Sequence, residues 1–263
     1  MSGIEAQARG ATVIPRAETV WREAFRVHFY EAEPNGRASA AALCRYFLEA
    51  ADNQCSQHGC SLAQLHKTGR MWVLGRFALR MYRFPCTGQA VTIETWPSGS
   101  AGSFRGYRDF RASTTTDEIL GQACSVWFLL DAASRRPVRL PQFILDLNLP
   151  AAEGERVDAR KLTPPVAIDC ERELVVRFSD LDANAHANSA CYLEWLLEPL
   201  PASLRHERTL SSLEIVFQNE VLVGEHLISA AGPGVSSSTG TNFAHALRSG
   251  NGQPVAMGRS EWI

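Results

Sequence analysis

Five polar side chains occupy alternate positions in one short segment: Asp180, Asp182, Asn184, His186 and Asn188. In an extended backbone, alternate side chains face the same way, so carboxylate, carboxamide and imidazole groups would share one wall. The apolar run that follows predicts a helix, whose first N–H groups and positive dipole end attract developing negative charge. The segment therefore has the groups needed to activate water and to stabilise the anion that forms when water attacks a carbonyl carbon.

The same residues also suit a purely structural role. Asp and Asn favour turns because their side chains hydrogen-bond to nearby backbone groups. Asn188 or Ser189 can also cap a helix that Pro199 ends. On spacing alone, an Asx-rich turn with a helix cap and an acyl-transfer site are both open interpretations.

An internal repeat bears on this choice. Residues 29–49 match residues 178–198 at an offset of 149 residues, and Arg37 stands in the first copy where His186 stands in the second. A structural turn has little reason to differ in this way, whereas a two-lobed enzyme with one working site does. We therefore expect a duplicated unit with the imidazole in its second copy.

Each copy is predicted to contain one apolar helix and several strands. A second sequence match, Ser-Val-Trp at 125–127 and Ser-Glu-Trp at 260–262, supports the duplication. The helices are expected over about 39–53 and 190–197, and both are apolar nearly all round, so other elements must wrap them. Strand-like patterns mark residues 72–82, 89–96, 104–113 and 119–130 in the first copy and 212–219, 226–230, 241–248 and 254–263 in the second.

The predicted fold class is α+β, a tandem or double hotdog in which antiparallel strands wrap around each central helix. A polar stretch with a Pro-Pro pair predicts an extended connection between the copies. We therefore expect an N-terminal hotdog at 1–150, a linker at 151–170, and a C-terminal hotdog at 171–263 that carries the histidine segment and hence the catalysis.

Composition and charge exclude several classes of protein. The 263 residues are 45% hydrophobic and 21% charged, which is typical of a globule with a sizeable core rather than a disordered chain. A net charge of −2 provides no global basic field for nucleic acid, and no apolar run approaches the roughly 18 residues that span a bilayer. The cysteines and histidines show no metal-binding spacing. We expect a cytoplasmic protein with reduced thiols, no metal and no cofactor.

Several short motifs, taken together, resemble one known family. They are Trp72-Val73, Arg83-Phe84-Pro85, Thr95-Trp96, Arg108-Asp109, Ser125-Val126-Trp127, Arg135-Arg136, S-D-L-D-x-N-x-H-x-N at 179–188, Ser211-Ser212-Leu213 and Glu261-Trp262. From about Trp21 onward the chain resembles the acyl-[acyl carrier protein] thioesterases of plant plastids and their bacterial relatives. The resemblance implies a double hotdog fold. It also implies hydrolysis of the thioester between a fatty acyl chain and the phosphopantetheine arm of acyl carrier protein.

The resemblance assigns catalytic roles to four residues, which are Asp182, Asn184, His186 and Glu220. His186 or Glu220 would take the proton from water. Asp182 would hold the imidazole in its useful tautomer, and Asn184 would position the water or the carbonyl. Many plant members carry Cys directly after the Glu, whereas Val221 stands there in this chain, which excludes a cysteine acyl-enzyme at that position.

If the second copy carries the chemistry, the first copy is free to hold the acyl chain. Bulky residues of the first copy could line such a pocket: Trp72, Phe77, Leu79 and Met81. The alternative is a packed core, in which the same residues fill the space. The resemblance places chain-length selection in this half, so smaller residues at Leu79 or Met81 are expected to lengthen the preferred chain.

An acidic carrier protein would need a basic docking face on this chain. Two arginine groups are candidates: Arg105, Arg108 and Arg111, or Arg135, Arg136 and Arg139. No nucleic-acid partner is expected, and a homodimer is left open. The rival functions are an acyl-CoA thioesterase, a hotdog hydro-lyase acting on hydroxyacyl chains, and a non-catalytic acyl-binding hotdog protein.

Overall fold

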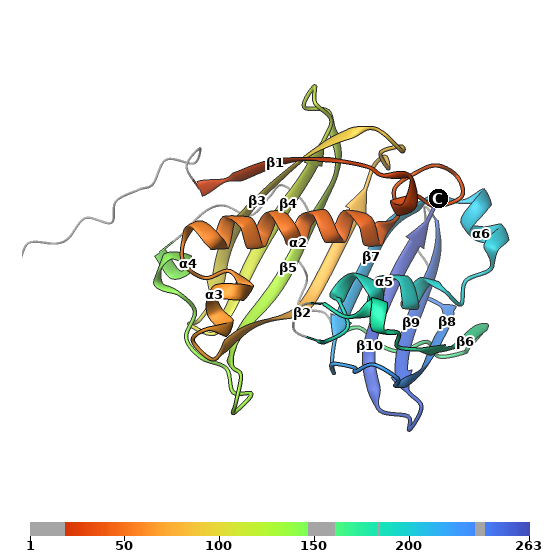
Figure 1. Ribbon diagram of the computed structural model, residues 1–263. Helices are drawn as coiled ribbons and strands as arrows, with labels where there is room; N and C mark the ends of the chain where they lie inside the picture. Colours follow the sequence, from red (N-terminus) through yellow and green to blue (C-terminus); the bar gives the residue numbers. More distant parts are fainter. Residues whose placement is uncertain (1–18, 147–160, 183–184, 235–239) are drawn as a thin grey trace, which may run out of the picture.

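The computed structural model describes residues 19–146, 161–182, 185–234 and 240–263 (Figure 1). The N-terminal lobe contains β1 (Trp21–Arg26), η1 (Phe29–Glu31), α2 (Ala40–Gln57), α3 (Leu62–His66), β2 (Arg70–Met81), β3 (Ala90–Ala101), β4 (Arg105–Ser113), β5 (Ile119–Asp131) and α4 (Gln142–Asp146). The C-terminal lobe contains β6 (Cys170–Val175), η2 (Phe178–Asp180), α5 (Ser189–Leu197), α6 (Ala202–Glu207), β7 (Leu210–Phe217), β8 (His226–Pro233), β9 (Thr241–Ser249) and β10 (Pro254–Trp262).

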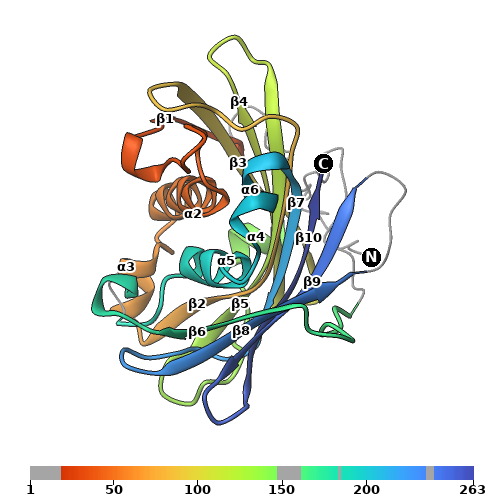
Figure 2. The ribbon, with the colours of Figure 1, turned by 90° about the vertical axis from the view of Figure 1, so that its right-hand side faces the viewer.

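The strands of both lobes form one antiparallel sheet in the order β1-β3-β4-β5-β2-β7-β10-β9-β8-β6. The second half of this order mirrors the first, so an approximate twofold axis relates the lobes and passes between β2 and β7. Figures 1 and 2 show the sheet curving around α2 and α5, which lie next to each other on its concave face. The architecture is the double hotdog that the sequence predicts.

The internal repeat is visible as two equivalent loops that lead into the central helices. Each loop begins with a short 3-10 helix, η1 or η2. An isolated bridge then joins Ala32 to Ala38 in the first loop and Leu181 to Ala187 in the second. The bridged residues are separated by the same offset as the sequence match, so the repeat corresponds to a repeated backbone geometry.

The second sequence match, between residues 125–127 and 260–262, also corresponds to a repeated structure. The Trp127 indole donates to Ser125 Oγ at 2.7 Å on β5, and the Trp262 indole donates to Ser260 Oγ at 2.9 Å on β10. β5 lies beside β2, and β10 lies beside β7. The two Ser-x-Trp segments therefore hold equivalent places on either side of the lobe boundary.

The lobes are joined by direct pairing of β2 with β7, in which Ala78 lies opposite Glu214. The Glu214 side chain is buried, and both Arg76 and Arg259 pair with it, Arg76 Nε at 2.6 Å. An unpaired buried charge costs several kcal/mol. The two arginines therefore make this carboxylate a fastening point for β2, β7 and β10.

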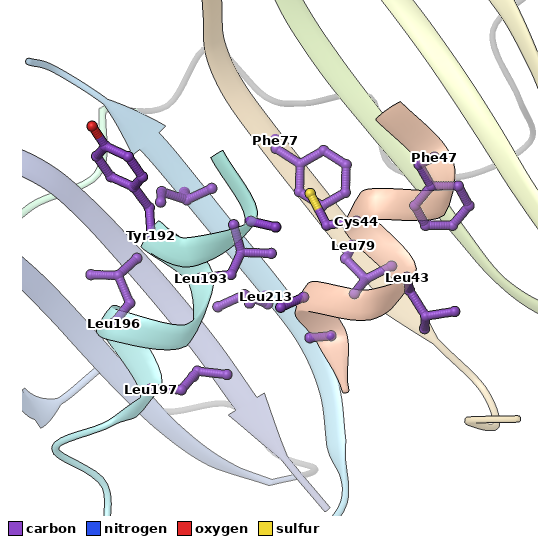
Figure 3. Close-up of a cluster of buried hydrophobic side chains, with 14 of the residues drawn as sticks. Leu43, Cys44, Phe47, Phe77, Leu79, Tyr192, Leu193, Leu196, Leu197 and Leu213 are labelled. Carbon is purple, nitrogen blue, oxygen red and sulfur yellow. The ribbon is translucent and has the colours of Figure 1, made fainter. Parts of the chain in front are cut away.

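The core lies between the concave face of the sheet and the two central helices (Figure 3). In the N-terminal lobe the Phe47 ring of α2 packs near Phe77 of β2 and Phe110 of β4, with centroid distances of 6.4 and 5.1 Å. Arg45 of α2 and Glu194 of α5 form an ion pair at 2.9 Å where the helices meet. The apolar helices are wrapped, as their composition requires.

Some elements differ from their predicted limits. β3 continues to Ala101, beyond the strand that the sequence predicts at 89–96. A bulge between Pro97 and Gly99 allows this: Pro97, which has no N–H, stays opposite Arg108, Ser98 is left without a partner, and Gly99 adopts a φ of 119°. α2 extends to Gln57, beyond its expected end at 53. The short helices α3, α4 and α6 escape prediction because five or six residues carry little periodic signal.

The two central helices differ in length, with 18 residues in α2 and nine in α5. No helix of the described residues is long and apolar enough to cross a membrane. The predicted linker at 151–170 lies partly outside the described residues, and β6 begins at Cys170. The domain limits given above therefore stay a prediction.

We expect the free energy of unfolding to fall as the pH drops from about 6.5 to about 4, partly through His245. Burial lowers the pKa of His245 to about 4, and its Nε2 lies 2.8 Å from Ser260 Oγ. An unfolded histidine titrates near 6.5, so within this window only the unfolded chain binds the proton. By linkage the folded state loses up to about 3 kcal/mol.

Urea unfolding between about pH 7 and pH 4.5 tests this contribution. Other titrating groups act in the wild type and in a His245→Gln variant alike, so the difference between them isolates the histidine. The variant should lose less stability over this range. Equal losses in the two proteins would contradict the prediction.

Candidate active site

His186 lies in the loop between η2 and α5, but this loop is not one extended wall. The Asp182 N–H donates to the His186 carbonyl at 2.8 Å, and the N–H of Ala185, which has a φ of 60°, donates to the Asp182 carbonyl at 3.0 Å. The Asp182 carboxylate accepts from the His186 backbone N–H at 3.4 Å. Asn188 caps α5 by accepting from the Ala190 N–H at 2.9 Å. The segment is thus an Asx-rich turn with a cap, and the same turn presents the imidazole.

Glu220 follows β7, and the residues just before it are anchored to other elements. The N–H groups of Gln218 and Asn219 donate to the Val255 carbonyl at 3.0 and 3.1 Å. The Tyr192 hydroxyl of α5 donates to the Asn219 carbonyl at 3.4 Å. Burial raises the pKa of Tyr192, which keeps this hydroxyl protonated and able to donate. The helix that follows the histidine loop therefore also holds the backbone beside Glu220.

The imidazole and the carboxylate face each other, with 3.5 Å between His186 Nε2 and Glu220 Oε2. Their loops are joined by a hydrogen bond of 3.4 Å from the Ala187 N–H to the Val221 carbonyl. Arg135 reaches Glu220 from the connection between β5 and α4, with Nη1 3.1 Å from Oε2 and Nη2 2.7 Å from Oε1. The pair predicted from the C-terminal lobe is therefore completed by a guanidinium from the N-terminal lobe.

These groups open onto a cavity of about 880 Å³ between the two lobes. The C-terminal lobe contributes the following lining residues: Asp182, His186, Asn188, Ser189, Tyr192 and Glu220. The N-terminal lobe contributes residues from α2, from the start of β2 and from β5, among them Leu48, Ala51, Cys55, Val73, Trp127 and Leu130. The part of α2 beyond the length of α5 forms one wall, so the inequality of the helices helps to create the space.

The predicted pocket residues divide into two sets. Trp72 lines the cavity, and its indole donates to the Cys60 carbonyl at 2.9 Å. Phe77, Leu79 and Met81 are buried in the core instead and are not among the lining residues. These three residues lie further along β2, and Figure 3 shows Phe77 and Leu79 beside the central helices. Their part in selecting the acyl chain stays a prediction.

Two other polar residues of the histidine segment have different outcomes. Asp180 is buried and pairs with Arg177 at 2.7 Å, so it stabilises the start of the loop rather than facing the cavity. Asn184 lies outside the described residues, and its role stays a prediction.

The equivalent loop of the N-terminal lobe carries different chemistry. Arg37 stands at the position of His186 and donates to Thr209 Oγ1 at 3.1 Å. Backbone hydrogen bonds shared by the lobes place Phe84, which is buried, at the position of Glu220. The shared bonds run from the Ala38 N–H to the Pro85 carbonyl and from the Ala187 N–H to the Val221 carbonyl. Both members of the pair are therefore replaced in the first lobe.

The arginines considered for docking are in part committed elsewhere. Arg108 is buried, and its Nη1 donates to Gln54 Oε1 at 2.6 Å, so it cannot form part of a docking surface. Arg111 pairs with Glu94, and Arg135 pairs with Glu220. The sequence contains no signal for the last pairing, because the two residues come from different lobes. Within the described ranges, no cluster of three or more His, Cys, Asp or Glu side chains could hold a metal ion.

Comparison with known proteins identifies the family. Residues 18–147 match the model of the acyl-ACP thioesterase N-terminal domain, and residues 165–263 match that of the C-terminal domain. The chain belongs to the acyl-ACP thioesterase family. An acyl-[acyl-carrier-protein] hydrolase of Cuphea viscosissima is 28% identical over 92% of this chain. The chain spans 62% of the length of that relative.

Two solved structures resemble the whole chain. The 12:0-ACP thioesterase from Umbellularia californica superposes with a TM-score of 0.79 and is 27% identical, covering 93% of this chain and 94% of its own. An acyl-ACP thioesterase from Bacteroides thetaiotaomicron superposes with a TM-score of 0.81 at 23% identity, covering 94% of this chain and 99% of its own. Both likenesses extend over the two lobes.

The core position of Met81 leads to a prediction about stability. Met81 is 4% exposed, and its sulfur lies close to the backbone of Gly121 on β5. Truncation in a packed core leaves a void, so Met81→Ala should lower the free energy of unfolding by about 2–5 kcal/mol. Tyr82→Ala, at an exposed neighbour, should change it by less than about 0.5 kcal/mol. Chemical denaturation of both variants measures the difference, and a Met81→Ala variant as stable as the Tyr82→Ala control would contradict a core role.

Proposed function

We propose that this chain hydrolyses the thioester of a fatty acyl group carried by acyl carrier protein, releasing the free fatty acid. The observation that carries the proposal is the His186 Nε2 to Glu220 Oε2 contact of 3.5 Å at the wall of the cavity between the lobes. Membership of the family and the likeness to the Umbellularia 12:0-ACP thioesterase support the same reaction. The cavity supplies a volume typical of a small-molecule site for the acyl chain.

The geometry favours His186 as the group that takes the proton from water. Glu220 faces the imidazole, and its two oxygens also accept hydrogen bonds from Arg135. A carboxylate held in this way is suited to orient the imidazole and to stabilise the imidazolium that forms. Asp182 contacts the backbone of the histidine, so its contact supports the shape of the turn.

The start of α5 provides a place for the developing negative charge on the carbonyl oxygen. Asn188 and Ser189 line the cavity at the first turn of the helix. Backbone N–H groups at a helix N-terminus favour an anion, and one such donor is worth a few kcal/mol when it is held in place. We assign the oxyanion to this turn, on the same wall of the cavity as His186.

The partner would be acyl carrier protein, which delivers its acyl chain on a phosphopantetheine arm. Arg105, Arg136 and Arg139 are exposed and remain the candidates for a basic docking face. A homodimer and a cytoplasmic location stay predictions. No metal or cofactor takes part in the proposed reaction.

Replacing His186 tests the catalytic assignment. His186→Ala should lower kcat by about 10²–10⁴-fold, the usual contribution of a positioned acid–base group, with the fold intact. His206→Ala, at an exposed histidine of α6, is the matched control and should turn over like the wild type. Release of fatty acid from dodecanoyl- and palmitoyl-carrier protein measures both. Wild-type turnover by purified His186→Ala would contradict the role.

The same assays separate the rival functions. Faster turnover of acyl-CoA than of acyl-carrier protein would indicate an acyl-CoA thioesterase. Release of water from a 3-hydroxyacyl substrate would indicate a hydro-lyase. Binding of fatty acid without turnover, unaffected by His186→Ala, would indicate an acyl-binding protein.

The length of the acyl chain should depend on cavity residues rather than on the core of β2. Ala51 lines the cavity from α2, so Ala51→Leu should fill part of it and shift the released fatty acids toward shorter chains. Met81→Ala should leave the profile unchanged because Met81 does not line the cavity. Mass spectrometry of fatty acids released from a mixed acyl-carrier pool measures both profiles. A longer fatty acid released by Met81→Ala would instead support the expectation from the sequence that Met81 lines the acyl pocket.

A further inference from the structure

One charged contact crosses between the lobes beside the catalytic pair. The Arg135 guanidinium makes two nearly parallel hydrogen bonds to Glu220, of 2.7 Å to Oε1 and 3.1 Å to Oε2. Oε2 is also the oxygen that lies 3.5 Å from His186 Nε2. Arg135 and His186 therefore share one oxygen of the same carboxylate, and both line the cavity.

Glu220 has little else to hold its side chain in place. The side chain is 46% exposed, and the two residues after Val221, Leu222 and Val223, are themselves exposed. A glutamate in such a position can turn its carboxylate away from the imidazole. A bidentate arginine pair fixes both the position and the plane of a carboxylate, which a single hydrogen bond does not.

The loop that carries Arg135 is held in a defined conformation by hydrogen bonds. The Asp131 carboxylate accepts from the backbone N–H and from the hydroxyl of Ser134, at 2.8 and 2.7 Å. Arg135 has a φ of 56°, a conformation that residues other than glycine rarely adopt. Its Nη1 also lies 3.4 Å from the Met71 sulfur at the start of β2. The guanidinium is thus held from its backbone and along its side chain.

We propose that Arg135 is a positioning residue for the hydrolytic reaction, supplied by the N-terminal lobe to hold Glu220 against His186. The inference rests on the proposed function for its catalytic consequence. It also removes Arg135 from the set of residues that dock the carrier protein. The N-terminal lobe then contributes to the chemistry itself as well as to the wall of the cavity.

The first test compares Arg135→Ala with Arg83→Ala. Arg83 forms an ion pair with Glu118 at the same 2.7 Å, with 49% of its side chain exposed against 47% for Arg135, and it does not line the cavity. Arg135→Ala should lower kcat by about 10- to 100-fold with little change in KM, since misplacement of a catalytic group costs rate. Arg83→Ala should match the wild type.

Two substrates separate positioning from docking. The loss of kcat in Arg135→Ala should be the same for dodecanoyl-carrier protein and for the dodecanoyl thioester of N-acetylcysteamine, which has no protein to dock. A rise in KM on the carrier substrate alone, with normal turnover of the small thioester, would assign Arg135 to docking and overturn the proposal. Normal kinetics on both substrates would overturn it as well.

Two further variants test whether Arg135 acts through Glu220. Arg135→Lys keeps the charge but loses the two-pronged contact, so its kcat should lie between those of wild type and Arg135→Ala. Arg135→Ala made in a Glu220→Gln background should cause little additional loss, because the group that it positions is already gone. Losses that multiply in the double variant would overturn the proposal.

A spectroscopic measurement keeps the inference separate from the proposed function. The nitrogen-15 signal of His186 Nε2, assigned by its disappearance in His186→Ala, should move in Arg135→Ala and in Glu220→Gln but not in Arg83→Ala. If the wild type hydrolyses none of the thioesters, the proposed function fails, and this signal still decides the positioning role. An unmoved signal in Arg135→Ala would overturn it.

Discussion

Antiparallel pairing of β2 with β7 is the constraint on which the rest of this structure depends. It converts two five-stranded half-sheets into one curved sheet and brings α2 and α5 together on its concave face. Glu214 stabilises this β2–β7 seam, because its buried carboxylate forms ion pairs with Arg76 of β2 and Arg259 of β10. The cavity between the lobes exists because the seam sets the walls of both lobes against each other.

The approximate twofold symmetry of this assembly is broken at the candidate site. Equivalent loops lead into both central helices, yet one carries His186 and the other Arg37. The position of Glu220 is taken by the buried ring of Phe84 in the first lobe. The longer α2 then covers space that α5 leaves open. Duplication supplied two similar scaffolds, and different side chains give one lobe the imidazole and carboxylate and the other most of the wall.

Much of the fold was predictable because its signals are local. Alternation of apolar residues marks most of the strands, and helices that are apolar all round must be enclosed by other elements. The bulge at Pro97 and the short helices were not predictable, since a proline within a strand and a helix of five residues depend on tertiary contacts for their conformation. For the same reason Met81, bulky and apolar, could not be distinguished as core or as cavity wall.

The sequence by itself determined the repeat, the double hotdog and the polar segment that holds His186, because these depend on residue type and spacing along the chain. Glu220 was singled out only by the resemblance to the family. Only the tertiary structure decided that His186 faces Glu220 and that Arg135 completes the pair. It also placed Phe77, Leu79 and Met81 in the core and outside the cavity beside His186. These outcomes depend on which side chains the β2–β7 seam brings together across the lobes, and residues so far apart in the chain leave no mark of their contact in its local pattern.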